Sequence, residues 1–416
     1  MSPALLALLA LLLAIALSIA TKVNVGLVSI ALAWLVGVYA GGMSPDAVLR
    51  GFPASLFLTL AGVTLLFAAA ESNGTLERVA ERLAALAKGS ARVLPLVLFV
   101  LASVLASVGP GAIAAVALLA PMAMLLGKRT GVSPLLTALM VTTGANSGNL
   151  SPLSPTGVVA NAKMAAGGIG GHEMKVWLAN LLAHVLVAAA MWLVLGRQAT
   201  GDGVRATGYG LVAPAPLDRR QRITGLIILL WVVGVLALKL NLGLSAFAAV
   251  ILLLALRAAE ERQTIARVPW TIVLMVCGVS VLVAVLEQTG GMDLFTSLLA
   301  KLASPGSING VIAFITGAIS TWSSTSGVVL PAFLPTVPKL VAQVGGGDPL
   351  AVALSINVGS SLVDVSPLST LGALCVAAAA EEDAGRLFRQ LLAFGLSMIF
   401  VGAALCQLLA GWFARL

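Results

Sequence analysis

Long apolar segments separated by short polar ones run along the whole 416-residue chain. Several windows hold about 18 nearly uncharged residues, which is the length that a helix needs to cross a bilayer. Examples are 3–20, 26–42, 223–238 and 391–413. The pattern predicts an all-α polytopic membrane protein. No Lys or Arg precedes the first window, so we interpret that window as a mature helix rather than an export signal.

Composition supports this prediction. Residues AVILMFWYC make up 60% of the chain and charged residues only 10%, whereas a soluble domain carries about 25% charged residues. Lipid must therefore cover the surface. The net charge of +8 is interpreted as loop charge that sets orientation, not as a nucleic-acid site. The three cysteines lie in apolar segments and fit neither a metal site nor a disulfide framework.

An internal repeat is visible in the sequence. Segments 52–74 and 268–290 match at a constant offset of 216, with Pro, Gly and Glu at equivalent positions. Segments 144–157 and 359–372 match at an offset of 215 and share Ser-Pro-Leu-Ser. A weaker match at offset 217 joins Asn24 and Gly26 to Asn241 and Gly243. Three collinear matches indicate a duplication.

The repeat divides the chain into two halves, 1–197 and 222–416, joined by a polar, basic linker at 198–221. Each half is predicted to hold five transmembrane helices and a re-entrant hairpin. The first half has helices within 1–90 and 176–197, a hairpin at 93–127 and a broken helix at 134–166. The second half has helices within 223–302 and 389–413, a hairpin at 309–340 and a broken helix at 348–380.

Five crossings per half would insert the two halves in opposite orientations, as inverted repeats. With both termini outside, the cytoplasmic loops hold 17 of the 24 Lys and Arg residues. This excess favours that orientation in a bacterial inner membrane.

Four predicted breaks lie at membrane depth: the hairpin tips 107–111 and 320–327, and the helix breaks 144–157 and 359–372. Lipid cannot satisfy the backbone groups that such breaks expose, so they occur only inside protein or beside a watery cavity. Paired breaks in two inverted halves are typical of a transporter's binding site. No Walker A loop, Gly-x-Ser-x-Gly or His-Glu-x-x-His motif is present, so neither an enzyme nor ATP-driven transport is indicated.

The breaks supply the candidate site residues. Half-helix N-termini and hydroxyls suit an anion, whereas unwound carbonyls and Ser, Thr and Asn oxygens suit a small cation such as Na+. The predicted substrate-binding residues are Ser107, Gly109, Pro110, Asn146, Ser151, Ser154, Ser324, Thr325, Ser366, Ser369 and Thr370. The predicted cation-binding residues are Ser103, Ser107, Asn146, Asn149, Ser320, Ser323, Thr325, Ser361 and Asp364.

Asp364 is the one acid within the breaks. It is interpreted as a cation ligand or proton carrier, with a helix-capping role as the alternative. Glu71 and Glu287 are expected to cap helices or make interfacial contacts. His184 is expected to have a hydrogen-bonded packing role. Trp322 either lines the pocket or packs against the partner hairpin.

The segments at 51–79, SVGPGAIAAVALLAP from Ser107 and GANSGNLSPLSPTGVVAN from Gly144 resemble the malonate/dicarboxylate carrier type of the ion transporter superfamily. They are more distantly similar to the divalent anion/sodium symporters. The close resemblance covers about 50–165, and the architectural one covers nearly the whole chain. The symporters' Ser-Asn-Thr tip motif is replaced here by Ser107-Val108-Gly109-Pro110 and Ser323-Ser324-Thr325-Ser326.

The resemblance implies an elevator mechanism, a homodimer, a C3–C4 dicarboxylate substrate and Na+ coupling without a cofactor. Two alternatives stay open from the residues: a Na+/H+ antiporter of the same fold, in which Asp364 carries the proton, and a non-transporting membrane scaffold.

Overall fold

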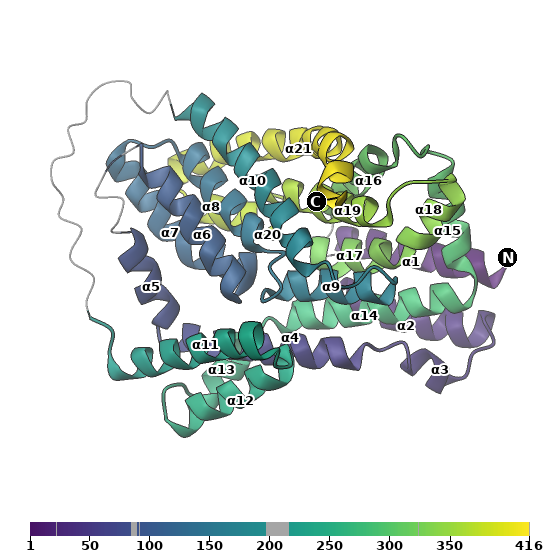
Figure 1. The fold of residues 1–416 in the computed structure, drawn as a ribbon, viewed down its shortest axis with the longest axis horizontal. Helices are drawn as coiled ribbons and strands as arrows, with labels where there is room; N and C mark the ends of the chain where they lie inside the picture. The colour runs from purple at the N-terminus through teal and green to yellow at the C-terminus, as the bar shows by residue number, and fades with distance from the viewer. Residues whose placement is uncertain (22, 85–89, 91, 197–215, 323, 416) are drawn as a thin grey trace.

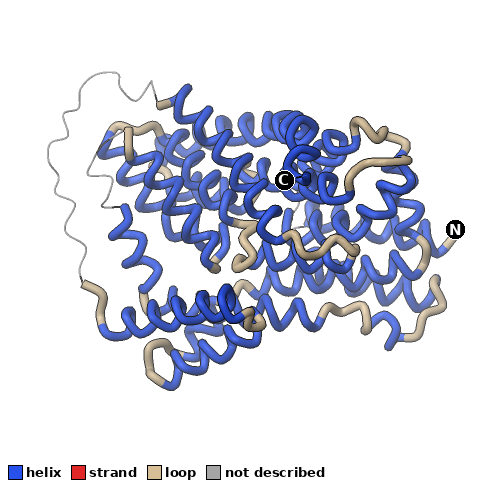
Figure 2. The backbone as a smooth tube through the Cα atoms, in the orientation of Figure 1, coloured by secondary structure: helices blue, strands red, loops and turns tan. Residues whose placement is uncertain are grey.

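The computed structural model describes residues 1–21, 23–84, 90, 92–196, 216–322 and 324–415. Within these residues the chain forms helices and loops, without a strand (Figure 2). Two groups of helices lie at opposite ends of the long axis (Figure 1). One group is α1 (Pro3–Thr21), α2 (Val25–Trp34) and α3 (Pro45–Leu49), and the other is α11 (Arg219–Leu238), α12 (Leu242–Ala255) and α13 (Glu261–Arg267).

Six helical segments of the described chain are long and apolar enough to cross a membrane. Counting the pair Val273–Gln288 and Gly291–Ala300, bent by 89°, as one span gives seven. This is fewer than the ten predicted crossings, because several predicted spans form apolar helices of only 10–17 residues, such as Pro3–Leu17 and Leu242–Ala255. The six segments are Ala54–Ser72, Gly111–Lys128, Glu173–Leu195, Thr325–Val344, Pro349–Ala378 and Glu381–Arg415.

The first half continues with an arm helix, a hairpin and a helix in two pieces. Pro134 at the first turn and a Ser133 side chain that accepts from the Leu136 N–H start the two-piece helix. Gly131, at φ 76°, ends the second hairpin arm in the left-handed conformation that glycine adopts freely. The helices are α4 (Ala54–Ser72), α5 (Thr75–Ala84), α6 (Leu94–Val108), α7 (Gly111–Thr130), α8 (Pro134–Gly148), α9 (Pro155–Ala166) and α10 (Glu173–Leu195).

The second half has the same order, but the second arm of its hairpin is divided into short pieces. Pro331, Pro335 and Pro338 each lack the N–H that a continuous helix needs. The pieces are a π-helix η4 (Thr325–Val329), α17 (Leu330–Phe333), a 3₁₀ turn η5 (Leu334–Thr336) and α18 (Val337–Val344). The other helices are α14 (Trp270–Gln288), α15 (Gly291–Ala300), α16 (Ile308–Trp322), α19 (Pro349–Leu362), η6 (Val363–Val365), α20 (Thr370–Ala378) and α21 (Glu381–Arg415).

The last helix begins earlier than predicted, at Glu381 rather than 389. Its first turn holds three acidic residues, which apolar windows exclude but which the positive end of a helix dipole stabilises.

Two close helix crossings connect the halves, α2 on α14 and α12 on α4. A Cβ on Gly26 would lie 2.3 Å from the Leu274 carbonyl oxygen, and one on Gly278 would lie 2.2 Å from the Gly26 carbonyl oxygen. In the other crossing, a Cβ on Gly62 would lie 2.4 Å from the Gly243 carbonyl oxygen. The helix backbones therefore touch, as small residues allow in membranes. These glycines occupy the positions that match in the sequence repeat.

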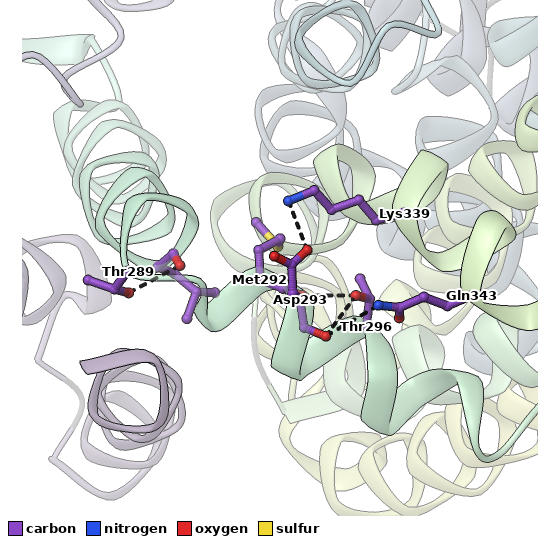
Figure 3. Close-up of polar contacts among 7 residues, drawn as sticks. Thr289, Met292, Asp293, Thr296, Lys339 and Gln343 are labelled. Atoms are coloured by element: carbon purple, nitrogen blue, oxygen red, sulfur yellow. Dashed lines mark hydrogen bonds and ion pairs between the residues drawn. The ribbon is translucent and has the colours of Figure 1, made fainter. Parts of the chain in front are cut away.

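Helix α15 is tied to the end of the second hairpin (Figure 3). Lys339 Nζ on α18 lies 3.0 Å from Asp293 Oδ1, and the Gln343 side chain donates to the Asp293 carbonyl at 3.5 Å. Both partners of the ion pair are partly exposed, so its contribution to stability is at most about 1 kcal/mol.

Candidate functional site

A cavity of ≈490 Å³ lies where the hairpin tips and the helix breaks come together. Its size is within the usual range of small-molecule sites, about 300–1,000 Å³. Helices α4 and α14 form part of its wall through Thr64, Phe67 and Met275. The tips contribute 110–112 and 324–326, and the breaks contribute Asn149, Pro155, Thr156, Asp364 and 368–371.

The first break connects to the first hairpin. Helix α8 ends at Gly148 and α9 begins at Pro155. Between them, Asn149 Oδ1 accepts a hydrogen bond from the Ala112 N–H at 3.3 Å, in the first turn of the second hairpin arm. The Ser154 side chain caps α9 by accepting from the Gly157 N–H at 3.1 Å. The break and the hairpin tip therefore form one polar unit.

The second break repeats this arrangement with a charged residue. The Thr325 hydroxyl, at the tip of the second hairpin, donates to Asp364 Oδ2 at 2.8 Å. Ser320 is also hydrogen-bonded to Thr325. Ser369 caps α20 by accepting from the Gly372 N–H at 3.5 Å. Asp364 is 215 positions after Asn149, so equivalent residues of the two halves each hold a hairpin tip.

Glycine makes the first hairpin tip possible. Gly109 has φ 150° and Gly111 has φ 78°, both in the region that favours glycine. A Cβ on Gly109 would also lie 1.8 Å from Cε2 of Phe67 on α4. The tip therefore packs directly against the arm helix.

Three helices begin at the cavity wall: α7 at Gly111, α9 at Pro155 and α20 at Thr370. Their first turns carry the partial positive charge of the helix dipole. This is a favourable setting for an anion.

The cavity also has a charged pair, which sequence reasoning did not place there. Arg267 Nη1 lies 3.1 Å from Glu71 Oε1, and both residues line the cavity. The pair agrees with the interfacial contact expected of Glu71. The predicted topology placed Arg267 among the 17 Lys and Arg residues of the cytoplasmic loops. The sequence signal for its position is Pro269, two residues further on, because Pro269 matches Pro53 at the start of the other arm helix.

The structure divides the predicted site residues into two groups. The cavity is lined by Pro110, Asn149, Ser324, Thr325, Asp364, Ser369 and Thr370. Ser323 lies outside the described residues. The predicted residues that do not line the cavity are Ser103, Ser107, Gly109, Asn146, Ser151, Ser154, Ser320, Ser361 and Ser366.

Several of the second group have polar atoms engaged within the protein. Ser151 Oγ donates to the Ser107 carbonyl at 2.6 Å, and Ser107 Oγ donates to the Ser103 carbonyl at 2.7 Å. Ser154 caps α9, as described above. Ser366 is fully buried. These residues hold the breaks in shape rather than facing the cavity.

His184 is fully buried on α10, and its Nδ1 lies 2.8 Å from the Asn180 carbonyl. The hydrogen-bonded position expected of it is thus observed. The side chain of Trp322 lies outside the described part of the chain. Among the described residues, no three His, Cys, Asp or Glu side chains gather into a metal site.

Comparisons with known proteins show which proteins this chain is similar to. Residues 1–149 match the family model of the N-terminus of the dicarboxylate carrier protein MatC. The chain is 24% identical over 359 residues to the magnetosome protein MamN of Paramagnetospirillum magneticum. The aligned region covers 82% of this chain and 80% of MamN. The crystal structure of the Alcanivorax borkumensis YdaH transporter has the same fold, with a TM-score of 0.54 at 15% identity. That match covers 88% of this chain and 87% of the YdaH chain.

The resemblance inferred from the sequence motifs is therefore confirmed for the dicarboxylate carrier type. These similarities and the long apolar helices support a multi-pass membrane transporter rather than an enzyme. The alternative of a non-transporting scaffold loses its support.

Proposed function

We propose that this transporter of the dicarboxylate carrier type couples a cation, Na+, to symport of a C3–C4 dicarboxylate such as malonate, malate or succinate. The observation that carries the proposal is the cavity in which three helix N-termini and both hairpin tips meet. Hydroxyls of Ser324, Thr325 and Thr370, together with these helix ends, would bind the carboxylates.

The charges of the cavity support coupling to a cation. Among the described lining residues, Glu71 and Asp364 are acidic and Arg267 is basic. A dianion entering such a site would add to an existing negative charge when both acids are ionised, and a co-bound cation would offset it. Asp364 and Asn149, each bonded to a hairpin tip, are the proposed ligands on the two sides of the substrate.

The proposed movement is an elevator motion. The hairpins and broken helices would move as one unit along α4 and α14, which belong to the scaffold together with the helices at both ends of the molecule. The glycine crossings of α2 on α14 and of α12 on α4 support a scaffold shared by two inverted repeats. The proposal includes a homodimer, an inner-membrane location and both termini outside.

The decisive experiment is counterflow of labelled malonate, malate and succinate in proteoliposomes, with and without a Na+ gradient. Saturable counterflow that requires Na+ is expected. Thr325→Val should lower it at least about tenfold, because the variant removes the hydrogen bond to Asp364. Thr316→Val is the matched control, since Thr316 is equally buried but bonds only within α16.

A Na+/H+ antiporter of the same fold is the second candidate, favoured by the two carboxyl groups in the cavity. It predicts no dicarboxylate counterflow but Na+-driven proton movement, read with a pH-sensitive dye in the same vesicles. Movement of neither solute would refute both functions.

A further inference from the structure

A group of buried polar side chains lies outside the cavity, where α8, α10 and α19 pack together. We call it the buried polar cluster: Thr143, Asn146, Asn180, His184, Asn357 and Ser361. Each residue is at most 1% exposed. Each also has a side-chain polar atom without a hydrogen-bond partner among the described residues.

Helix α10 connects the two broken helices through this cluster. Asn180 Nδ2 donates to the backbone carbonyl of Asn146 on α8 at 2.7 Å. His184 Nδ1 lies 2.8 Å from the backbone carbonyl of Asn180, and the ring also lies next to the backbone of Ser361 on α19. Hydrogen-bonding contacts thus link Asn146, Asn180, His184 and Ser361 across three helices.

The cluster faces away from the hairpins. Gly144 packs on the first hairpin, with an added Cβ 2.4 Å from the Phe99 carbonyl oxygen, and Gly359 packs on the second, 2.7 Å from the Ala313 Cα. A residue two positions further along a helix points to roughly the opposite side. Asn146 and Ser361 occupy those positions, and they are equivalent in the sequence repeat. Their side chains therefore belong to a location distinct from the tip sites predicted from sequence.

Three of the unpartnered atoms can only accept a hydrogen bond: Oδ1 of Asn146, Asn180 and Asn357. Asn146 Nδ2 can only donate, and the hydroxyls of Thr143 and Ser361 can do either. Leaving buried acceptors unpaired costs about 1–3 kcal/mol each.

The electrostatic setting also favours a positive charge. The cluster adjoins the last turns of α8, which ends at Gly148, and of α19, which ends at Leu362. Helix C-termini carry partial negative charge. Neither helix contains an Asp, Glu, Lys or Arg. Because no carboxylate is available in the cluster, the setting suits a singly charged ion rather than a divalent one.

We propose that the buried polar cluster binds a monovalent cation, Na+, at a site separate from the substrate cavity. The side-chain oxygens of Asn146, Asn180, Asn357 and Ser361 would be its ligands, and α10 would hold the two broken helices around it. The site stands independently of the proposed substrate, because it concerns cation binding by the substrate-free protein.

The test is thermal unfolding of the purified full-length protein during a NaCl titration, with choline chloride keeping the ionic strength constant. Na+ should raise the melting temperature of the wild type, because a ligand that binds the folded state stabilises it. Ser361→Ala and Asn180→Ala should each raise the Na+ concentration for half the effect at least about tenfold.

Ser29→Ala is the matched control. Ser29 on α2 is also fully buried with an unpartnered hydroxyl, but it lies outside the cluster. Its variant should keep the wild-type response. Repeating the series in an Asp364→Asn background removes any contribution from a cation in the cavity.

If a variant fails to fold, hydrogen exchange of the wild type with and without Na+ tests the same site. Na+ should slow exchange in α10 and in the last turns of α8 and α19. A wild type that ignores Na+ would overturn the proposal, as would an unchanged Na+ response in Ser361→Ala and Asn180→Ala. Dicarboxylate counterflow is measured separately, so failure of this site and failure of the proposed function are distinguishable.

Discussion

The crossing of α2 and α14 allows a quantitative test of the packing between the halves. Gly278→Ala places a methyl group 2.2 Å from the Gly26 carbonyl oxygen, 2.5 Å from its carbonyl carbon and 2.6 Å from its Cα. All three atoms are backbone, so no side chain can rotate away. Ordinary contact begins at 3.4 Å. The helices must therefore separate by about 1 Å, and such overpacking costs about 1–3 kcal/mol.

Alanine also favours a helix over glycine by about 1 kcal/mol, which partly offsets this cost. Gly225→Ala isolates that gain, because Gly225 lies within α11 and has nothing within 4 Å of an added Cβ. The difference in stability between the two variants should therefore equal the overpacking cost, near its upper end of about 3 kcal/mol.

The assay is thermal unfolding of both variants in the same detergent, followed by loss of the monodisperse peak in size-exclusion chromatography. The expected order of melting temperatures is Gly225→Ala at or above the wild type, and Gly278→Ala below it. Equal melting temperatures for the two variants would show that α2 and α14 do not meet backbone to backbone.

Three further predictions concern the cavity. Asp364→Asn should change the Na+ or pH dependence of counterflow without loss of folded protein; an unchanged dependence would leave Asp364 as a structural cap. Arg267→Ala should raise KM for a dicarboxylate about tenfold by removing a charged contact, measured from initial uptake rates, and an unaltered KM would exclude such a contact. Gly109→Ala should abolish transport because its Cβ collides with Phe67. The control is Gly131→Ala, also at positive φ but in open space, which should lower the free energy of unfolding by only about 1 kcal/mol. Similar uptake by both variants would contradict the packing of the tip on α4.

The breaks were predictable from sequence because local chemistry determines them. Ser154 and Ser369 cap the helices that restart after each break, and glycine occupies the left-handed positions of the first hairpin tip. A serine followed by proline or threonine at a helix start is a short-range signal. It needs no tertiary information.

Which residues face the cavity was not predictable in the same way. Asn146 lies in the predicted segment 144–157 but does not line the cavity, because Gly144 and Gly148 occupy the side of α8 that packs on α6. Arg267 reaches the cavity from another part of the chain, through its pairing with Glu71. Both results depend on how helices pack, and repeat matching alone does not give helix rotation.

The exchange of packing partners between the halves has a consequence for biogenesis. Helix α2 leaves the ribosome well before α14, whose backbone it contacts at Gly26, has been translated. Helix α4 is likewise translated before α12, whose backbone it contacts at Gly62. In the N-terminal half, α2 and α4 therefore have no such packing partner until the second half has been translated, and a nascent chain truncated at the linker would lack both α14 and α12.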